Sequence, residues 1–160
     1  MAGSFQTVNG NNHYLEANVI NDIPSMQKLA QRWPASVPIV WSGYEIGVAV
    51  PYPGVSIDHD FGYLPHHPVR EAYLLHKDEK PNDHPTWDLS SALYAVFPDR
   101  GYFDLSLSGT VTVEADGCTR FQPAKDDSGR DRFLILNPLQ AARVREALVQ
   151  FVVQPPRHLP

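Results

Sequence analysis

The 160-residue chain has almost no cysteine and no long apolar segment. Cys118 stands alone, so an intramolecular disulfide is excluded and a reducing compartment is compatible with the sequence. No stretch approaches the roughly 20 apolar residues that cross a bilayer. Residues 1–5 also lack the basic start and apolar core of a signal peptide. These absences predict a cytoplasmic chain with no membrane partner.

Charge is also scarce, because Asp, Glu, Lys and Arg make up only 19% of the residues and the net charge is -5. No face rich in Lys or Arg is visible, which argues against a nucleic-acid partner. The 42% of hydrophobic residues suffices for one ordinary domain over residues 1–160. The expected ligand is therefore a small neutral or weakly charged molecule.

The first forty residues carry the pattern of a β-α-β unit. Apolar residues recur at helical spacing from Ile23 to Trp33, and the apolar run 37–43 that follows is typical of a buried strand. An initial strand, a polar loop, this helix and this strand complete the unit. A right-handed crossover places the polar loop at the carboxyl end of a strand, where open α/β sheets bind ligands.

The rest of the chain predicts a mixed arrangement. Residues 44–54 are rich in turns, and their prolines argue against a long helix. The hydrophobic periodicity predicts helices at 68–76 and 89–97 and from Asn137 onward, and strands at 102–107, 110–115, 119–122 and 133–136. Asp116-Gly117 indicates a hairpin turn. The expected fold class is α/β, an open Rossmann-like sheet with a C-terminal antiparallel β-hairpin region and a final helix.

The strongest candidate for ligand binding is the polar segment before the first helix. In an extended segment Glu16 and Asn18 point to the same side, so that a carboxylate and an amide could grip adjacent hydroxyls of a sugar. Asn11 and Asn12 add amides in the preceding loop. The alternative interpretation is a polar turn followed by a helix cap at residues 21–22.

Four other features have ordinary structural alternatives. Residues 58–67 contain two aspartates and three histidines, but their spacing fits no standard zinc pattern and favours a polar loop. Residues 126–131 resemble a calcium loop superficially but lack its closing glutamate, which favours a flexible turn. Asp88 is expected to cap a helix, and Cys118 to be a small residue in a strand. Glu45 is a weaker candidate for acid–base chemistry.

The segments 1–5, 10–11 and 16–19 together resemble the middle of a nucleoside hydrolase of the inosine-uridine-preferring type. In that family a methionine, a loop asparagine, a glutamate and a second asparagine contact the nucleoside, chiefly its ribose. The resemblance gives these roles to Met1, Asn11, Glu16 and Asn18. The sequence departs from the family at Ala2 and Ala17, which replace a glycine and an aromatic residue.

Residues 85–94 resemble the same family at the start of a later helix. By this resemblance Asp88 is a ligand of the catalytic Ca²⁺, and Trp87 stands where the family has the histidine that protonates the departing base. His84 is a distant substitute for that histidine. The resemblance covers nearly the whole chain and implies the carboxyl-terminal half of the family's fold, with a role in purine and pyrimidine salvage.

The Asp-rich motif that supplies the family's main calcium ligands is absent from the sequence. We therefore expect a nucleoside hydrolase-like chain that binds a nucleoside or ribose-like ligand but does not cleave the N-glycosidic bond by itself. Its partner is then a missing N-terminal half or a second copy of the chain, and a signal peptide in a longer parent stays possible. One alternative is a non-catalytic sugar-binding or protein-interaction module. Another is an unrelated metal hydrolase that uses His59, Asp60, His66 and His67.

Overall fold

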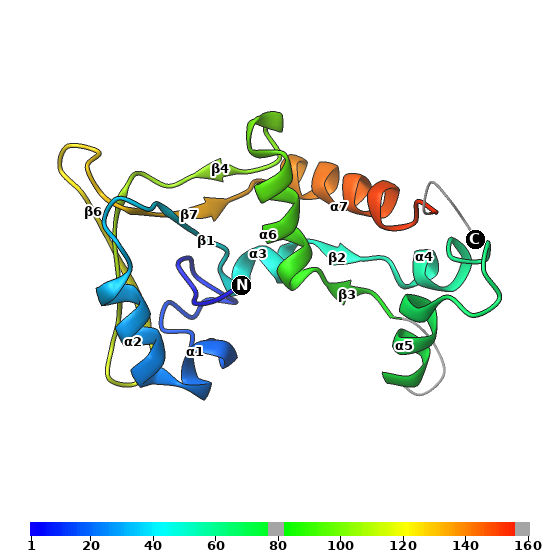
Figure 1. The fold of residues 1–160 in the computed structure, drawn as a ribbon, viewed down its shortest axis with the longest axis horizontal. Coiled ribbons are helices and arrows are strands. Elements are labelled where there is room, and N and C mark those ends of the chain that lie inside the picture. The colour runs from blue at the N-terminus through cyan, green and yellow to red at the C-terminus, as the bar shows by residue number, and fades with distance from the viewer. Residues whose placement is uncertain (77–81, 156–160) are drawn as a thin grey trace.

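Helices and two small sheets alternate along the chain in the computed structural model, which describes residues 1–76 and 82–155 (Figure 1). Within these residues the helices are α1 (Ala17–Asn21), α2 (Ile23–Arg32), α3 (Tyr44–Ala49), α4 (Gly54–His59), α5 (Pro68–His76), α6 (Trp87–Val96), the 3-10 helix η1 (Pro98–Arg100) and α7 (Pro138–Val152). The predicted α/β fold class is confirmed, and the sheets do not close into a barrel. No helix in the described part of the chain is both long enough and apolar enough to span a membrane.

The larger sheet is organised around β7 (Asp131–Ile135). This strand pairs in parallel with β1 (Ile39–Trp41) and antiparallel with β4 (Asp104–Leu105) and β5 (Gly109–Val113). The last strand, β6 (Thr119–Pro123), pairs with β5. A separate antiparallel pair joins β2 (Pro51–Tyr52) to β3 (His84–Pro85).

The β5–β6 hairpin forms where the sequence predicts it. Side chains of β5 alternate between buried and exposed positions, so one face of the hairpin packs inward. The turn closes through a bond from the Gly117 N–H to the Glu114 carbonyl (3.0 Å), and Gly117 has a φ of 91°, a conformation that suits glycine. Helix α2 packs against β5, where Val19, Ala30 and Val113 form a small core.

The predicted β-α-β unit is only partly present. Helix α2 and strand β1 form as expected, and the Asp22 carboxylate caps α2 by accepting from the Ser25 N–H (3.1 Å). Residues 1–5 are not a strand, which corrects the prediction. Two backbone bonds, from Ala2 N–H to the Ser42 carbonyl (3.1 Å) and from Tyr44 N–H to the Gly3 carbonyl (2.8 Å), fasten this segment beside the end of β1.

Two segments that the sequence analysis assigns to turns are ordered differently. Residues 44–54 contain helix α3 and the start of α4, because the prolines at 51 and 53 fall between the two short helices. The expected flexible turn over residues 126–131 ends in β7, whose first residue, Asp131, is fully buried. The expectation that no long helix forms in residues 44–54 is confirmed, although two short helices stand where turns were expected. In residues 126–131 only Asp131 departs from the expected turn, because tertiary packing places it in β7.

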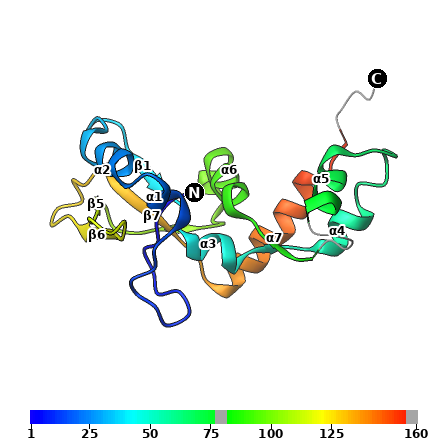
Figure 2. The ribbon, with the colours of Figure 1, turned by 90° about the horizontal axis from the view of Figure 1, so that it is seen from below.

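The larger core joins α3, α6 and α7. It contains Ile46, Leu93, Val144 and Leu148, with Leu134 contributed by the sheet. Helices α4 and α5 lie at the far end of the molecule from the β5–β6 hairpin (Figure 1). The amino terminus lies between α1 and α6 in both views (Figures 1 and 2), and this position brings the first residue to the candidate site.

Candidate functional site

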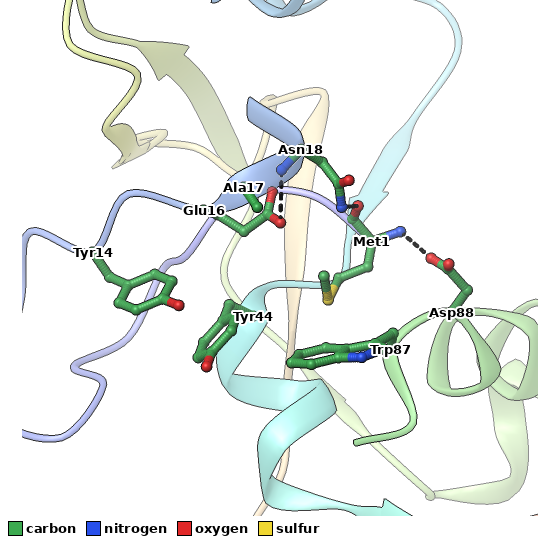
Figure 3. A pocket seen from close by; sticks show the side chains of 8 residues that line it. All are labelled: Met1, Tyr14, Glu16, Ala17, Asn18, Tyr44, Trp87 and Asp88. Atoms are coloured by element: carbon green, nitrogen blue, oxygen red, sulfur yellow. Dashed lines mark hydrogen bonds and ion pairs between the residues drawn. The ribbon is translucent and has the colours of Figure 1, made fainter. Parts of the chain in front are cut away.

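A pocket of about 340 Å³ lies between α1, the first turn of α3 and the first turn of α6. Its lining residues are Met1, Tyr14, Glu16, Ala17, Asn18, Tyr44, Trp87 and Asp88. Figure 3 shows the rings of Tyr14, Tyr44 and Trp87 in a row along one side, with the polar groups along the other. Four of the five residues assigned by the family resemblance thus line a single pocket: Met1, Glu16, Asn18 and Asp88.

Glu16 lines the pocket as a buried helix cap. It is 2% exposed, and its carboxylate accepts from the backbone N–H groups of Asn18 (3.0 Å) and Val19 (3.3 Å) at the start of α1. A third bond comes from the Gly3 N–H (3.2 Å). Glu16 and Asn18 are therefore not on one extended strand, which corrects the prediction: Glu16 precedes a helix and Asn18 lies inside it.

Asn18 connects α1 to the amino-terminal residue. Its side-chain amide donates to the Met1 carbonyl (3.3 Å), so one N–H of the amide is occupied and its oxygen stays available as an acceptor. Met1 itself is nearly buried, with 6% of its side chain exposed. The pair closes one wall of the pocket.

Asp88 enters the pocket from α6. It lies in the first turn of the helix but is not the N-cap, so the capping prediction is wrong. The N-cap is Thr86, whose side chain makes no capping bond to the helix backbone. The Asp88 carboxylate pairs with the amino group of Met1 (2.6 Å) across 87 positions of sequence. Its side chain is 83% exposed, which leaves lone pairs directed to solvent.

Three aromatic rings make the apolar side of the pocket. The Tyr14 and Tyr44 rings stack with centroids 4.2 Å apart, and Tyr44 lies 5.3 Å from Trp87. A hydrogen bond with Tyr44, followed by burial, raises the pKa of Tyr14 to about 12. The Tyr14 phenol therefore stays neutral and can donate at physiological pH. Sequence reasoning missed the tyrosines, because no spacing relates residues 14 and 44 and only the fold makes them neighbours.

Two predicted residues lie outside this pocket. Asn11 belongs to a tight turn that pairs with Val8, and its side chain accepts from the His13 N–H (2.8 Å). His84, the substitute proton donor, lies on β3 with its ring 5.5 Å from Tyr73, in a different hollow. None of the described residues that line the pocket is a histidine that could protonate a leaving base.

The pocket does not fit the calcium ion that the family resemblance implies. Ca²⁺ takes about six to eight oxygen ligands, whereas the described lining residues offer two carboxylates, Glu16 and Asp88, and one amide oxygen. Both Glu16 oxygens already accept backbone N–H bonds. The remaining ligand, Asp88, cannot hold the ion alone.

The histidines and aspartates of residues 58–67 do not gather around a common point. His66 pairs with Glu71 (2.6 Å) and His67 contacts the Tyr63 hydroxyl (3.0 Å), while His59 lies 3.8 Å from Asp58. Among the described residues, the side chains that lie close enough together to share a metal ion are those of His13, Glu114 and Cys118. The arrangement favours the polar-loop interpretation over the metal hydrolase.

Glu45 is a buried carboxyl group that holds the amino-terminal segment against α3. It accepts from the Phe5 N–H (3.1 Å) and from the Ser4 hydroxyl (3.1 Å), and it does not line the pocket. Burial raises the pKa of Glu45 above its ordinary value of 4.5, although these bonds oppose the shift. Its role is therefore to position the segment that carries Met1.

Replacing Glu45 by glutamine should remove a pH dependence of stability. Because its folded pKa is raised, Glu45 stabilises the protein fully below the unfolded pKa, near 4.5, and this contribution is lost as pH rises through the folded value. Glutamine can still accept from Phe5 and donate to Ser4, but it does not titrate. Urea denaturation from about pH 4 to about pH 8 measures this, with the exposed Glu146→Gln as control. Equal pH profiles for Glu45→Gln and wild type would contradict it.

The site therefore combines three rings, one carboxylate with free lone pairs and one amide oxygen on a surface built from three separate parts of the chain, residues 1–18, Tyr44 and residues 87–88. Such a combination suits a small ligand with hydroxyl groups and a flat face. Comparison of the chain with protein-family models, with curated proteins and with solved structures finds no match in any of the three.

Proposed function

We propose that the chain binds a ribonucleoside, or another ribose-containing small molecule, in the pocket between α1, α3 and α6. The observation that carries the proposal is the convergence of Met1, Glu16, Asn18 and Asp88 on one pocket from two distant segments. The resemblance to nucleoside hydrolases selects the ligand class. The resemblance rests on the sequence alone, and it gives these residues the roles of nucleoside contacts and metal ligand without using their positions in space.

The two sides of the pocket match the two parts of a nucleoside. The exposed Asp88 carboxylate can accept from a pair of vicinal hydroxyls, and the Asn18 amide oxygen adds a further acceptor. The rings of Tyr44 and Trp87 offer flat apolar area for a base. A ribose alone uses only the polar side and should bind more weakly than a nucleoside.

The proposal does not include hydrolysis by this chain alone. Cleavage of an N-glycosidic bond needs an activated water and an acid for the leaving base. In the described residues the pocket has no histidine, and its buried carboxylate is occupied by backbone N–H groups. Inosine and uridine should therefore bind without release of free base, with Ca²⁺ present or absent.

Asp88→Asn should weaken nucleoside binding without changing stability. Loss of the charged acceptor removes one or two charge-assisted hydrogen bonds, and affinity for inosine should fall about 10- to 100-fold. The side chain is 83% exposed, so the urea midpoint should stay within error of wild type. Binding of inosine, uridine and ribose is measured by isothermal titration calorimetry.

The matched control is Asp99→Asn, which removes an exposed aspartate from η1, beyond the other end of α6. It should leave the affinity for inosine unchanged. Ligand binding should also alter the fluorescence of Trp87, since Trp41 is buried and Trp33 lies outside the pocket. Absence of binding of all three ligands at millimolar concentration, or equal affinity in Asp88→Asn, would refute the proposal.

A further inference from the structure

A second cluster of polar side chains gathers at the turn of the β5–β6 hairpin. It contains Glu114, directly after β5, Cys118, directly before β6, and His13 from the amino-terminal loop. One ligand atom from each of the three residues lies within 4.8 Å of the other two. Cys118 is buried, while the side chains of His13 and Glu114 are both 44% exposed. The cluster is thus a half-open site with its sulfur on the inner side.

The hydrogen-bonding roles of the two His13 ring nitrogens follow from their neighbours. Its Nε2 lies 2.7 Å from an oxygen of Asp116, and its Nδ1 lies 3.0 Å from a guanidinium nitrogen of Arg120. Arginine can only donate, so Nδ1 must accept, and Nε2 therefore carries the proton and donates to Asp116. Many metal-binding histidines show this arrangement, in which a carboxylate orients the ring and the other nitrogen presents its lone pair.

Asp116 is itself held in place by the hairpin. Its other oxygen accepts from the Cys118 N–H (2.9 Å). This backbone bond holds the carboxylate in position to accept from His13 Nε2 and so keeps the imidazole in one tautomer. Asp116 acts as a positioning residue rather than a ligand.

The cluster already holds a positive group, the Arg120 guanidinium. Its Nε donates to Glu114 (3.2 Å) and a second nitrogen contacts His13 Nδ1, so Arg120 contacts two of the three candidate ligands. The Arg120 side chain is 47% exposed and can move into solvent. A metal cation that binds here has to displace the Arg120 guanidinium, so Arg120 competes with the metal for Glu114 and His13.

We propose that His13 Nδ1, the Glu114 carboxylate and the Cys118 sulfur form a binding site for a zinc-class divalent cation. Imidazole, carboxylate and thiolate are the three ligand types that zinc takes, and Ca²⁺ or Mg²⁺ would not choose the sulfur. Tetrahedral zinc places its ligand atoms about 3.5 Å apart. The observed group needs only side-chain adjustment to reach that spacing, and a water completes the fourth position.

Cobalt and zinc titrations of the untagged protein test the proposal. One Co²⁺ per chain should bind with a thiolate-to-metal absorption band in the near ultraviolet, which can come only from Cys118 because the chain has no other cysteine. Zn²⁺ should displace the Co²⁺ and remove the band. Cys118→Ser should abolish the band and weaken Zn²⁺ binding at least tenfold, whereas His66→Ala, which removes an exposed histidine elsewhere, should change neither.

Arg120→Gln separates this site from adventitious binding. The variant removes an exposed competitor and no ligand, so the affinity for Zn²⁺ should rise about tenfold or more, measured against a chromophoric chelator. This test does not require a change at the buried Cys118. A Co²⁺ spectrum without the thiolate band, or an unchanged zinc affinity in Arg120→Gln, would overturn the assignment.

Discussion

Replacement of Asp131 by alanine should destabilise the fold by about 3–5 kcal/mol, the cost of breaking a buried ion pair. Asp131 is fully buried at the start of β7, and its two oxygens accept from Nε and Nη2 of Arg130, both at 2.9 Å. The same carboxylate accepts from the Val111 N–H of β5 (2.8 Å). Alanine leaves all of these donors without their partner.

The expected loss of stability is large because Arg130 is itself mostly buried and also holds the end of α2. Its guanidinium donates to the Ala30 carbonyl (2.7 Å) and the Trp33 carbonyl (2.9 Å), at the end of α2. The Arg130 side chain is only 13% exposed, so solvent cannot compensate the lost carboxylate. Asp131 and Arg130 thus join β5, β7 and α2 through one buried pair.

Asp127→Ala is the matched control, since it breaks a second aspartate–arginine pair in the same region. Asp127 accepts two bonds from Arg132, at 2.7 and 2.9 Å, but its side chain is 66% exposed. Its loss should cost about 1 kcal/mol or less. Urea denaturation of both variants measures the difference. Similar values for the two would show that burial does not set the strength of these pairs.

Glu16→Ala should lower the free energy of unfolding by about 2–4 kcal/mol. The Glu16 carboxylate satisfies three backbone N–H groups, two at the start of α1 and one at Gly3, in a position that is 2% exposed. Its removal leaves these donors without an acceptor and releases the amino-terminal segment from α1. The substitution should therefore also speed up amide hydrogen exchange at Gly3, Asn18 and Val19.

Two further variants show whether the effect of Glu16→Ala comes from the lost carboxylate. Glu16→Gln keeps one acceptor oxygen and should lie between wild type and Glu16→Ala, while Glu146→Ala removes an exposed glutamate from α7 and should stay within about 0.5 kcal/mol of wild type. A cost for Glu16→Ala as small as that of Glu146→Ala would mean that the carboxylate does not cap α1. That result would favour a role for Glu16 in ligand binding alone.

Local patterns predict the elements that short-range interactions define. Asp116-Gly117 forms its hairpin turn, and Asn137 forms a capping box with Gln140 at the start of α7. Alternation along β5 and the helical spacing in α2 are also confirmed. Each of these signals involves residues a few positions apart, so the sequence displays both members of the interaction.

Predictions that depended on long-range burial fared worse. Asp131 lies in a polar stretch that favours a flexible turn, yet it is buried because Arg130 and the Val111 N–H satisfy it. Glu16 was expected to face a ligand from a strand, but it caps a helix and also holds Gly3. A polar residue shows its partner only after folding, because its sequence neighbours do not supply the matching donors.

The sequence by itself determined the α/β class, the hairpin turn and the helix caps at Asp22 and Asn137. Tertiary structure alone decided that Tyr14, Tyr44 and Trp87 form one wall, and that His13 reaches the hairpin carrying Glu114 and Cys118. The physical reason is that caps and turns are closed by bonds within a few residues. Pockets and ligand clusters instead need chain crossings whose positions depend on the packing of the whole molecule.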